Sequence, residues 1–311
     1  RRLINWWSCL TFRNPYWHQA IRRFSRDLGV QALHIHDLPL VGTAVAVGQE
    51  LGIPVVADLH ENYASAVQNY YDSRLKKAFL YPRRRWMRFE RAGCLAADRV
   101  ICVIYESRDR LVAQGIPAGK IVVVPNTTHP SFAQLPRDPE ILRRYEGRFV
   151  ISYVGAINTN RDIESLLRAT AQVRPTIPGL QLLLVGNSPE WHLRRLRQLA
   201  DELAVADITE FTGWQPIDLL PSYIAASAIC TLPLRPSEQA HASGPHKFFQ
   251  YGLMGKPTIV SDCRSLQRMA QESGGALVFR SQDADSLAEA IRRLHAEPAL
   301  CRSLGEKGRA Y

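Results

Sequence analysis

Short runs of β-branched and other apolar residues alternate along the chain with longer segments whose apolar residues recur at helical spacing. This alternation is typical of βα units arranged around a parallel sheet. In the first half it predicts strands at residues 31–37, 54–60, 99–105 and 120–126, with helices at 38–51, about 72–96 and 106–114. In the second half it predicts strands, each followed by a helix, at residues 148–155, 180–186, 208–213, 227–234, 257–262 and 275–279.

A polar segment with three prolines separates the two series of βα units. It predicts a linker at residues 127–147, between an amino-terminal domain at 1–126 and a carboxy-terminal domain at 148–311. The expected fold class is α/β, with two doubly wound, Rossmann-like domains. Ligands of such sheets bind beyond the carboxyl ends of the strands, so we expect the turns there to converge on one crevice.

Composition narrows the class of protein. The 311 residues are 46% apolar and 22% charged, as in an ordinary globular protein. The longest nearly apolar run, residues 38–48, is shorter than the roughly 20 residues that span a bilayer. Six cysteines lack a CxxC pair or metal-binding spacing, which favours a reducing, cytoplasmic location. The chain starts without methionine and without a signal peptide, so we expect a fragment.

The formal charge of +10 is concentrated in one segment. Residues 74–91 hold eight basic side chains and one glutamate, interleaved with Leu75, Phe79, Trp86 and Phe89. This composition suits an element at the anionic inner face of a membrane, or a solvated helix packed by its aromatic side chains. Nucleic acid is the least favoured partner, because no recognition module accompanies the charge.

The stretch SGPHKFFQYGLMGKP, residues 243–257, predicts an anion-binding helix start. Pro245 suits a first helical position, whereas Gly255 and Pro257 mark the helix end. The first N–H groups of a helix have no partner within it and carry partial positive charge. His246 and Lys247 add donors beside them, so an anionic ligand is expected here.

Eight motifs occur in a characteristic order: HIHD, VVADLHENY, KIVVVPN, SYVGAINTNRDIESLLRA, LLLVGNSPE, ITEFTGW, SAICTLPL and PHKFFQYGLMGKPTIVSD. In this order the chain resembles the retaining glycosyltransferases of family 4, which have the GT-B fold, over nearly its whole length. The resemblance implies an acceptor bound by the first domain and a nucleotide-diphosphate sugar bound by the second, with no metal and no other cofactor. Relatives have further units at both ends, so we expect both ends to be missing here.

The resemblance also implies roles for residues of the first domain. His60 matches the family's active-site histidine, which contacts the donor sugar or orients the acceptor hydroxyl. The alternative is a strand-end histidine bonded to a neighbouring carbonyl. His34, His36, Asp37 and Glu61 are expected on the acceptor side, where a purely structural role is an equal alternative.

On the donor side, Arg161 and Lys247 are expected to hold the diphosphate, with Gly155 allowing close approach and Asp162 capping the following helix. Many relatives carry two cations in this loop, and this chain has one. Gln250 stands where the family has a glutamate for the ribose hydroxyls, and Ala242 replaces an earlier glutamate. The other implied nucleotide-sugar contacts are Gly186, Asn187, Gly213, Trp214, Ser243, Gly244 and Pro245.

The resulting hypothesis is a hexosyltransferase that retains anomeric configuration and uses a lipid-linked sugar or surface polysaccharide as acceptor. One alternative is a nucleotide-sugar epimerase or hydrolase on the same fold. Another is a non-catalytic scaffold of a polysaccharide assembly complex, which Gln250 and the single loop cation favour.

Overall fold

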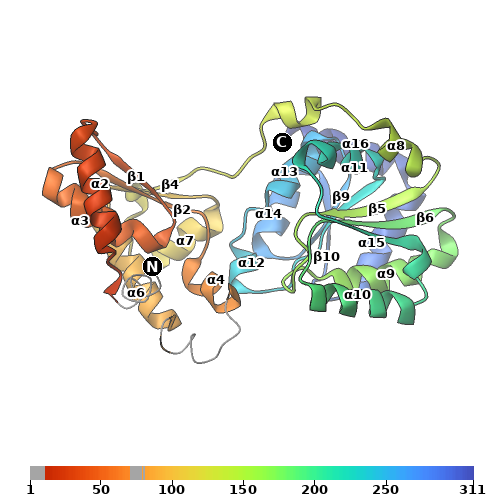
Figure 1. Ribbon diagram of the computed structural model, residues 1–311. Coiled ribbons are helices and arrows are strands. Elements are labelled where there is room, and N and C mark those ends of the chain that lie inside the picture. The colour runs from red at the N-terminus through yellow and green to blue at the C-terminus, as the bar shows by residue number, and fades with distance from the viewer. Residues whose placement is uncertain (1–10, 71–78, 80) are drawn as a thin grey trace. The chain divides into compact units, whose positions relative to one another are not determined.

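The computed structural model describes residues 11–70, 79 and 81–311. The chain divides into two compact units (Figure 1). The first comprises residues up to Pro125 together with His241–Gly244, and the second comprises Asn126–Ala240 together with Pro245–Tyr311. The segment expected as a linker contributes a short helix to the second unit. There Asp138 accepts hydrogen bonds from the N–H groups of Glu140 and Ile141 at the helix start.

The first unit is built on a four-stranded parallel sheet of order β1-β2-β3-β4. The strands are β1 (Leu33–His36), β2 (Val55–Leu59), β3 (Arg99–Cys102) and β4 (Ile121–Val123), so each predicted strand of this half is confirmed with shorter bounds. The helices are α2 (Pro15–Asp27), α3 (Val41–Leu51), α4 (Tyr63–Tyr70), α6 (Arg83–Ala96) and α7 (Tyr105–Ala113), with 3-10 turns η1 (Leu38–Leu40) and η2 (Ala118–Lys120).

The helix predicted at about 72–96 is wrong in its bounds. In the described residues, α6 begins at Arg83, directly after Pro82, whose backbone is extended. Proline has no N–H to donate to a preceding turn, so a helix starts after it more readily than it runs through it. Residues 72–78 and 80 lie outside the described residues, and so do the first three cations of the basic segment 74–91.

Two aromatic residues of this segment, Trp86 and Phe89, face the core, whereas Phe79 is 72% exposed. Trp86 is 2% exposed, and the ring of Phe89 stacks on Phe12 at a centroid distance of 4.0 Å. Arg84 and Arg88 on the same helix are exposed. Because Trp86 and Phe89 are packed, they are not available to insert into a lipid surface, as expected for the alternative of a solvated helix, whereas Phe79 remains available.

The second unit is built on a six-stranded parallel sheet of order β10-β9-β8-β5-β6-β7. The strands are β5 (Phe149–Val154), β6 (Leu180–Val185), β7 (Thr209–Gly213), β8 (Ile229–Leu232), β9 (Thr258–Ser261) and β10 (Ala276–Phe279), again at the predicted places. From β5 the chain runs outward through β6 and β7, then returns to place β8 on the other side of β5. The strand order therefore reverses between β5 and β8, the position at which doubly wound sheets bind ligands.

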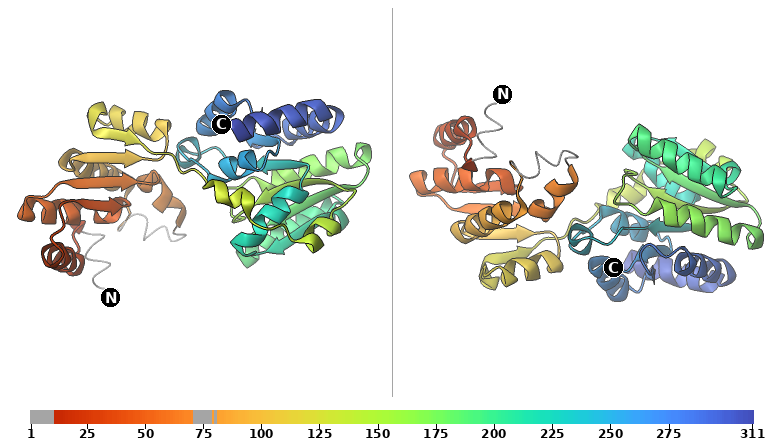
Figure 2. Two further views of the ribbon diagram at one scale, coloured as in Figure 1. Left: turned by 90° about the horizontal axis from the view of Figure 1, so that it is seen from above. Right: turned by 90° about the horizontal axis from the view of Figure 1, so that it is seen from below.

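Helices cover both faces of this sheet (Figures 1 and 2). Their bounds are α8 (Pro139–Arg144), α9 (Ile163–Val173), α10 (Glu190–Glu202), α11 (Leu220–Ala226), α12 (Glu238–His241), α13 (His246–Leu253), α14 (Arg264–Ser273), α15 (Ala284–Ala296) and α16 (Pro298–Ala310), with 3-10 turns η3 (Pro130–Gln134), η4 (Arg174–Thr176), η5 (Ala206–Ile208) and η6 (Ile217–Leu219). Among the described residues, no helix combines the length and apolar character needed to cross a bilayer.

Glycines allow α13 and α16 to cross at backbone contact. A Cβ atom on Gly252 would lie 2.5 Å from the carbonyl oxygen of Gly308. A Cβ atom on Gly305 would lie 2.2 Å from the carbonyl oxygen of Gly255, just beyond the end of α13. Any side chain at either position would force the two helices apart, so glycine fixes the place of α13 in the unit.

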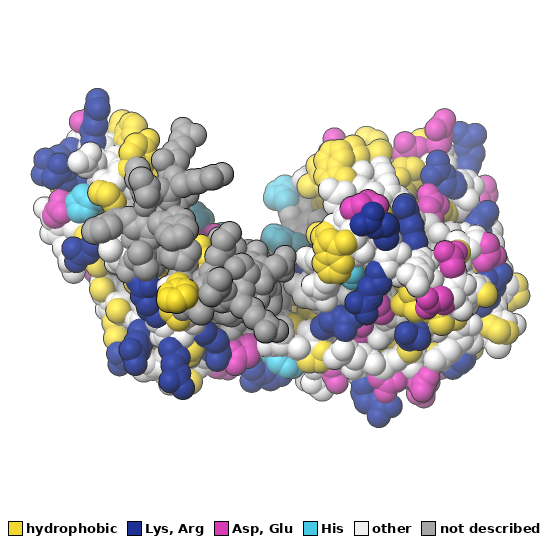
Figure 3. Space-filling model, turned by 60° about the horizontal axis from the view of Figure 1, so that its bottom comes forward, with side chains coloured by type: hydrophobic (Ala, Val, Ile, Leu, Met, Phe, Trp, Pro, Cys, Tyr) yellow, Lys and Arg dark blue, Asp and Glu magenta, His cyan; other side chains and the backbone are white. Residues whose placement is uncertain are grey.

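Charges on the second unit are mixed in sign. On the face drawn in Figure 3, basic and acidic side chains are interspersed. Ion pairs within the unit include Arg174 with Asp207 at 2.7 Å and Arg144 with Glu210 at 3.3 Å. Positive charge on this face is therefore balanced locally rather than gathered into a basic patch of the kind that binds phosphate backbones.

Candidate active site

The carboxyl ends of β5 and β8 bring Arg161 to the point where the strand order reverses. The loop after β5 runs antiparallel to the segment after β8, with an isolated bridge between Arg161 and Leu234. The N–H of Asp162 donates to the carbonyl of Pro233 at 2.9 Å. These backbone bonds hold the Arg161 position at the usual ligand site of this sheet type.

Two glycine turns at this edge pack against each other. Gly155 after β5 and Gly186 after β6 have φ angles of 139° and 145°, which only glycine adopts readily. A Cβ atom on Gly186 would lie 2.1 Å from the carbonyl oxygen of Gly155. The N–H of Ile157 donates to the carbonyl of Asn187 at 2.7 Å, so Asn187 supports the loop through its backbone, and its side chain is exposed.

Lys247 extends from the first turn of α13 across Gly155. A Cβ atom on Gly155 would lie 1.9 Å from the Cε of Lys247 and 2.5 Å from its Nζ, so the missing side chain provides the space for the lysine. Burial, together with the charge of Arg161, lowers the pKa of Lys247 to about 8. An amine partly withdrawn from water beside a second cation gains most from an anionic ligand.

The loop between Gly155 and α9 contains polar atoms without partners. Arg161 Nε and the Oδ1 atoms of Asn158 and Asn160 are buried and have no hydrogen-bond partner within the described part of the chain. Buried polar groups are normally satisfied, so such a concentration indicates a ligand or water site. The two asparagines were not among the residues predicted from the sequence. The feature of the sequence that could have identified them is an Asn-rich turn between a strand-end glycine and a helix.

Asp162 takes a different role from the predicted cap. It stands at the N-cap position of α9, but its side chain makes no capping bond. Its carboxylate instead accepts from the N–H of Gln282 at 3.0 Å and lies 3.5 Å from Arg235 Nη2. Arg235 also lies 2.8 Å from Glu164 Oε2. The buried carboxylate is thus directed toward Arg235 and the backbone of Gln282, away from the N–H groups of its own helix.

The start of α13 differs by one residue from the prediction. Pro245 precedes the helix as its N-cap, with extended backbone at φ −72° and ψ 121°, and His246 is the first helical residue. The cause is the ψ value of Pro245, which lies outside the helical region, while its carbonyl already accepts from the N–H of Phe248 at 3.0 Å. Gln250 follows on α13 and is half-buried.

The remaining predicted contacts are distributed between the units. Gly213 ends β7 with a φ of 72°, and Trp214 after it is 67% exposed, so its indole is available for stacking. Ser243 and Gly244 belong to the first unit, in which the hydroxyl of Ser107 donates to the carbonyl of Ala242 at 3.4 Å.

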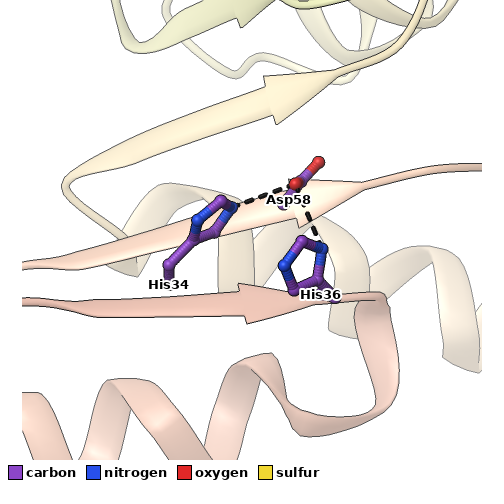
Figure 4. Close-up of side chains that lie close together, drawn as sticks. All are labelled: His34, His36 and Asp58. Carbon is purple, nitrogen blue, oxygen red and sulfur yellow. Dashed lines mark hydrogen bonds and ion pairs between the residues drawn. The ribbon is translucent and has the colours of Figure 1, made fainter. Parts of the chain in front are cut away.

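In the first unit, the predicted histidines surround one carboxylate at the ends of β1 and β2, and Figure 4 shows two of them, His34 and His36, beside Asp58. Asp58 Oδ2 lies 3.0 Å from His34 Nε2, 3.3 Å from His36 Nδ1 and 3.4 Å from His60 Nε2. Asp58 was missed in the sequence, although it stands two residues before His60 and therefore on the same face of the extended chain. His60 contacts this polar cluster through Nε2, whereas the structural alternative had it bonded to a carbonyl.

Asp37 connects these two strand ends in an unusual conformation. Its φ of 65° and ψ of 152° lie in a region that is essentially restricted to glycine. Its N–H donates to the carbonyl of Asp58 at 2.8 Å. Glu61, after His60, is half-buried. Strained backbone of this kind is concentrated at functional sites, so Asp37 supports a functional reading of the cluster.

Two family models match the chain. The model described as Glycosyltransferase Family 4 matches residues 1–132, and the model described as Glycosyl transferases group 1 matches residues 148–297. The first range contains the sheet of the first unit and the second range contains the sheet of the second unit.

Individual relatives agree with these models. The lipopolysaccharide core biosynthesis glycosyltransferase LpsD of Rhizobium meliloti (strain 1021) is 33% identical over 160 residues, which cover 51% of this chain and 43% of that protein. The alpha-D-kanosaminyltransferase of Streptomyces kanamyceticus is 21% identical over 297 residues, which cover 92% of this chain and 73% of that protein. The chain thus spans less than half the length of the first relative.

Solved structures share the fold. Sucrose-phosphate synthase from Thermosynechococcus elongatus superposes with a TM-score of 0.73 at 24% identity, covering 95% of this chain and 72% of that one. Anabaena HepE in complex with UDP superposes with a TM-score of 0.78 at 14% identity, covering 94% of this chain and 76% of that one. The solved structures show the GT-B fold, and the two family models, which together cover most of the chain, show that it belongs to the family 4 glycosyltransferases.

Proposed function

We propose that this protein is a retaining hexosyltransferase that moves a hexosyl group from a nucleotide-diphosphate sugar to a lipid-linked sugar or surface polysaccharide. The observation that carries the proposal is the pair of cations, Lys247 and Arg161, at the strand-order reversal of the second unit. They are close enough for Arg161 to lower the pKa of Lys247. Two neighbouring cations repel each other, and a diphosphate between them relieves that repulsion.

The donor's other parts fit the same edge of the sheet. The turns at Gly155 and Gly186 bring backbone close to a ligand without a side chain in the way. We assign the ribose to Gln250, whose amide can both donate and accept, and the base to the exposed ring of Trp214. HepE, whose fold this chain shares, has been solved with UDP and with UDP-glucose, which supports a nucleotide-sugar donor here.

The chemical step follows from the charge of the leaving group. As the glycosidic bond breaks, negative charge builds on the diphosphate. Lys247 and Arg161 therefore stabilise the transition state more strongly than they stabilise the bound substrate. Two fixed cations supply the electrostatic role that a divalent ion has in other transferases, so the proposed reaction needs no metal. Retention of configuration is proposed from the family resemblance.

The acceptor is assigned to the first unit. His60 is proposed to line the reacting centre, and His36, Asp37 and Glu61 to shape the acceptor side. One relative, LpsD, acts in lipopolysaccharide core biosynthesis, which supports a glycolipid or polysaccharide acceptor and a place at the inner face of a membrane. The basic segment 74–91 supplies charge for such a surface through exposed arginines such as Arg84 and Arg88, and Phe79 is its exposed aromatic side chain.

Binding of the donor is tested by calorimetry with UDP, GDP and ADP, each paired with its nucleoside. One diphosphate is expected to bind far more tightly than its nucleoside. Lys247→Ala removes a charge-assisted hydrogen bond, so its diphosphate affinity should fall about ten- to a hundredfold, while nucleoside affinity stays unchanged. Lys307→Ala removes an exposed lysine of the same unit and serves as the matched control.

Turnover separates this function from its two alternatives. With donor and acceptor, proton NMR should show product with the donor's anomeric configuration. Rapid conversion of donor alone to an isomer or to free sugar would identify an epimerase or hydrolase instead. Failure of every nucleoside diphosphate to bind would identify a non-catalytic scaffold, the alternative that Gln250 favours.

A further inference from the structure

Three imidazoles and a carboxylate form a compact cluster in the first unit, of which Figure 4 shows His34, His36 and Asp58. Asp58 Oδ2 is within 3.4 Å of a ring nitrogen of His34, His36 and His60. In addition, His36 Nδ1 lies 3.1 Å from His60 Nε2. We propose that this cluster binds a divalent transition-metal ion of the zinc class, with His34, His36 and Asp58 as ligands and His60 completing the set.

The spacing of the donor atoms suits a tetrahedral ion. With bonds of about 2.1 Å from metal to nitrogen or oxygen, neighbouring ligand atoms of a tetrahedron lie about 3.4 Å apart. Of the six separations among the four donor atoms, four are 3.0, 3.1, 3.3 and 3.4 Å, and the ligand atoms of His34, His36 and Asp58 all lie within 4.8 Å of one another. His34, His36 and Asp58 can therefore accept an ion through side-chain adjustments alone, and His60 has to turn toward His34 to complete the set.

Hydrogen bonding alone does not satisfy the cluster. The 3.1 Å contact between His36 Nδ1 and His60 Nε2 needs one nitrogen with a proton and one without. Both nitrogens also face Asp58 Oδ2, which as a carboxylate only accepts. The ring nitrogen without a proton then has nothing to donate to the carboxylate oxygen. If both nitrogens carry protons, their two N–H groups point at each other and repel. A metal ion accepts a lone pair from all of them at once.

Paired strands carry three of the ligands, and His60 directly follows the second strand. β1 and β2 pair in parallel register with His36 opposite Asp58, and His34 lies two residues earlier on the same face of β1. The Asp58 side chain is 10% exposed, whereas those of the three histidines are 41–60% exposed, so an ion can enter from solvent. Ligands carried on paired strands lose little freedom when an ion binds.

The donor set selects the kind of metal. Imidazole nitrogens favour zinc, cobalt, nickel and copper, whereas magnesium and calcium prefer sites made of oxygen atoms. Binding of such an ion does not rest on the proposed transfer reaction, in which the diphosphate is held by the cations of the second unit.

The test uses the full chain after treatment with a chelator, in the absence of any sugar nucleotide. Titration with Co²⁺ should produce the visible absorption of a tetrahedral complex, and calorimetry with Zn²⁺ should give about one equivalent with a Kd on the order of 1 µM. His34→Asn should weaken Zn²⁺ binding at least about tenfold. The matched control is His18→Asn, since His18 pairs with Glu50 at 2.8 Å elsewhere in the same unit and should not affect binding.

Two results would overturn the proposal: absence of Co²⁺ and Zn²⁺ binding at millimolar concentration, or equal affinity in the wild type and His34→Asn. A thermal melt without metal shows whether His34→Asn remains folded, as its half-exposed side chain suggests. Asp58→Asn provides an independent second variant, because it keeps the shape of the carboxylate but loses its charge. Zn²⁺ affinity should fall in this variant too, and unchanged affinity would count against Asp58 as a ligand.

One consequence does rest on the proposed function. A metal ion that takes the ring nitrogen of His60 removes this residue from the reacting centre, so Zn²⁺ should inhibit transfer and a chelator should restore it. In His34→Asn, inhibition relative to that variant's own metal-free rate should need at least about ten times more Zn²⁺. Equal sensitivity of both proteins would overturn this consequence, whereas a protein without transferase activity that still binds Co²⁺ would overturn only the proposed function.

Discussion

The side chain of Lys247 occupies the space that a side chain on Gly155 would need. This dependence gives a test at the scale of single residues. Gly155→Ala should displace the lysine and lower diphosphate affinity about tenfold or more, nearly as Lys247→Ala does. The double variant should lose no more than the Lys247→Ala variant alone, because both changes remove one interaction. Calorimetry on the three variants measures this, and additive losses would mean that the two residues act independently.

The pKa of Lys247 predicts how binding depends on pH. With a value of about 8, the amine loses its proton as pH rises from 7 to 9, so diphosphate affinity should fall over this range. The second ionisation of phosphate lies near pH 6, so the ligand's own charge hardly changes there. Lys247→Arg keeps its charge and should flatten the profile. An unchanged wild-type affinity up to pH 9 would contradict the prediction.

The same pKa shift predicts a gain in stability when the charge is removed. Folding lowers the pKa of Lys247 from its ordinary 10.5, so the unfolded chain holds this proton more tightly. The free energy of unfolding without ligand should therefore rise as pH increases from about 8 to 10.5. Lys247→Met should raise the melting temperature at pH 7 while lowering diphosphate affinity. Thermal melts with and without ligand measure the two effects. Loss of a purely structural lysine would instead lower both the melting temperature and the diphosphate affinity.

His60 is expected to act on turnover rather than on donor binding. His60→Ala should slow transfer by about a hundredfold or more, within the range of a positioned catalytic group, and leave diphosphate affinity nearly intact. Steady-state rates and calorimetry on the same preparation make the comparison. Equal loss of both quantities would indicate that the substitution disturbs folding.

Functional residues that lie in a familiar sequence motif were predictable. Residues whose role depends on neighbours that only the fold brings close were missed. His60 and Arg161 were predicted because they follow strands in recognisable segments. Asp58 was missed, since its role depends on β1 pairing with β2 in one register. Asn158 and Asn160 were missed because only the folded loop leaves their oxygens buried without partners.

At the scale of elements, the strands were predictable and several helix starts were not. Strands of a parallel sheet are buried on both faces, so they appear in the sequence as continuous apolar runs. Helix starts depend on single backbone angles. Pro82 and Pro245 each have extended backbone before a helix, and the carboxylate of Asp162 faces Arg235 rather than its own helix. These local features cannot be recognised in a sequence, where the apolar pattern is the main signal for a helix.

The crossing of α13 and α16 predicts graded effects of added methyl groups. Gly305→Ala should lower the free energy of unfolding by about 3 kcal/mol, because its Cβ would overlap the backbone of Gly255. Gly308→Ala should cost less, about 1 kcal/mol, since its nearest contact would be 3.3 Å. Gly119→Ala has open space and should be neutral or slightly stabilising. Urea unfolding compares the three, and equal effects would contradict the crossing.

At the scale of the whole molecule, the second unit carries both a complete sheet and the proposed donor site. Residues 126–311, expressed alone, should therefore unfold cooperatively and bind the same nucleoside diphosphate as the full chain. Chemical denaturation and calorimetry on this fragment provide the measurement. A fragment that fails to fold would show that the second unit needs the rest of the chain.

The fold as a whole was predictable because its motifs occur in a fixed order along the chain, and the two-domain α/β prediction is confirmed. The strand order was not readable from the pattern, since pairing joins segments far apart in sequence. β5 lies between β6 and β8, and the pairing of β8 with β5 spans more than 70 residues. The proposed donor site lies at that long-range junction.

The glycine crossing between α13 and α16 also has a genetic consequence. Because α13 carries Lys247, a change that loosens the crossing weakens the donor site without touching any residue in it. Alleles such as Gly252→Ser or Gly305→Ser are therefore expected to be temperature-sensitive. The host should make its glycan at low temperature and fail to make it at high temperature. Such conditional alleles would be recovered at positions that a search for active-site mutations overlooks.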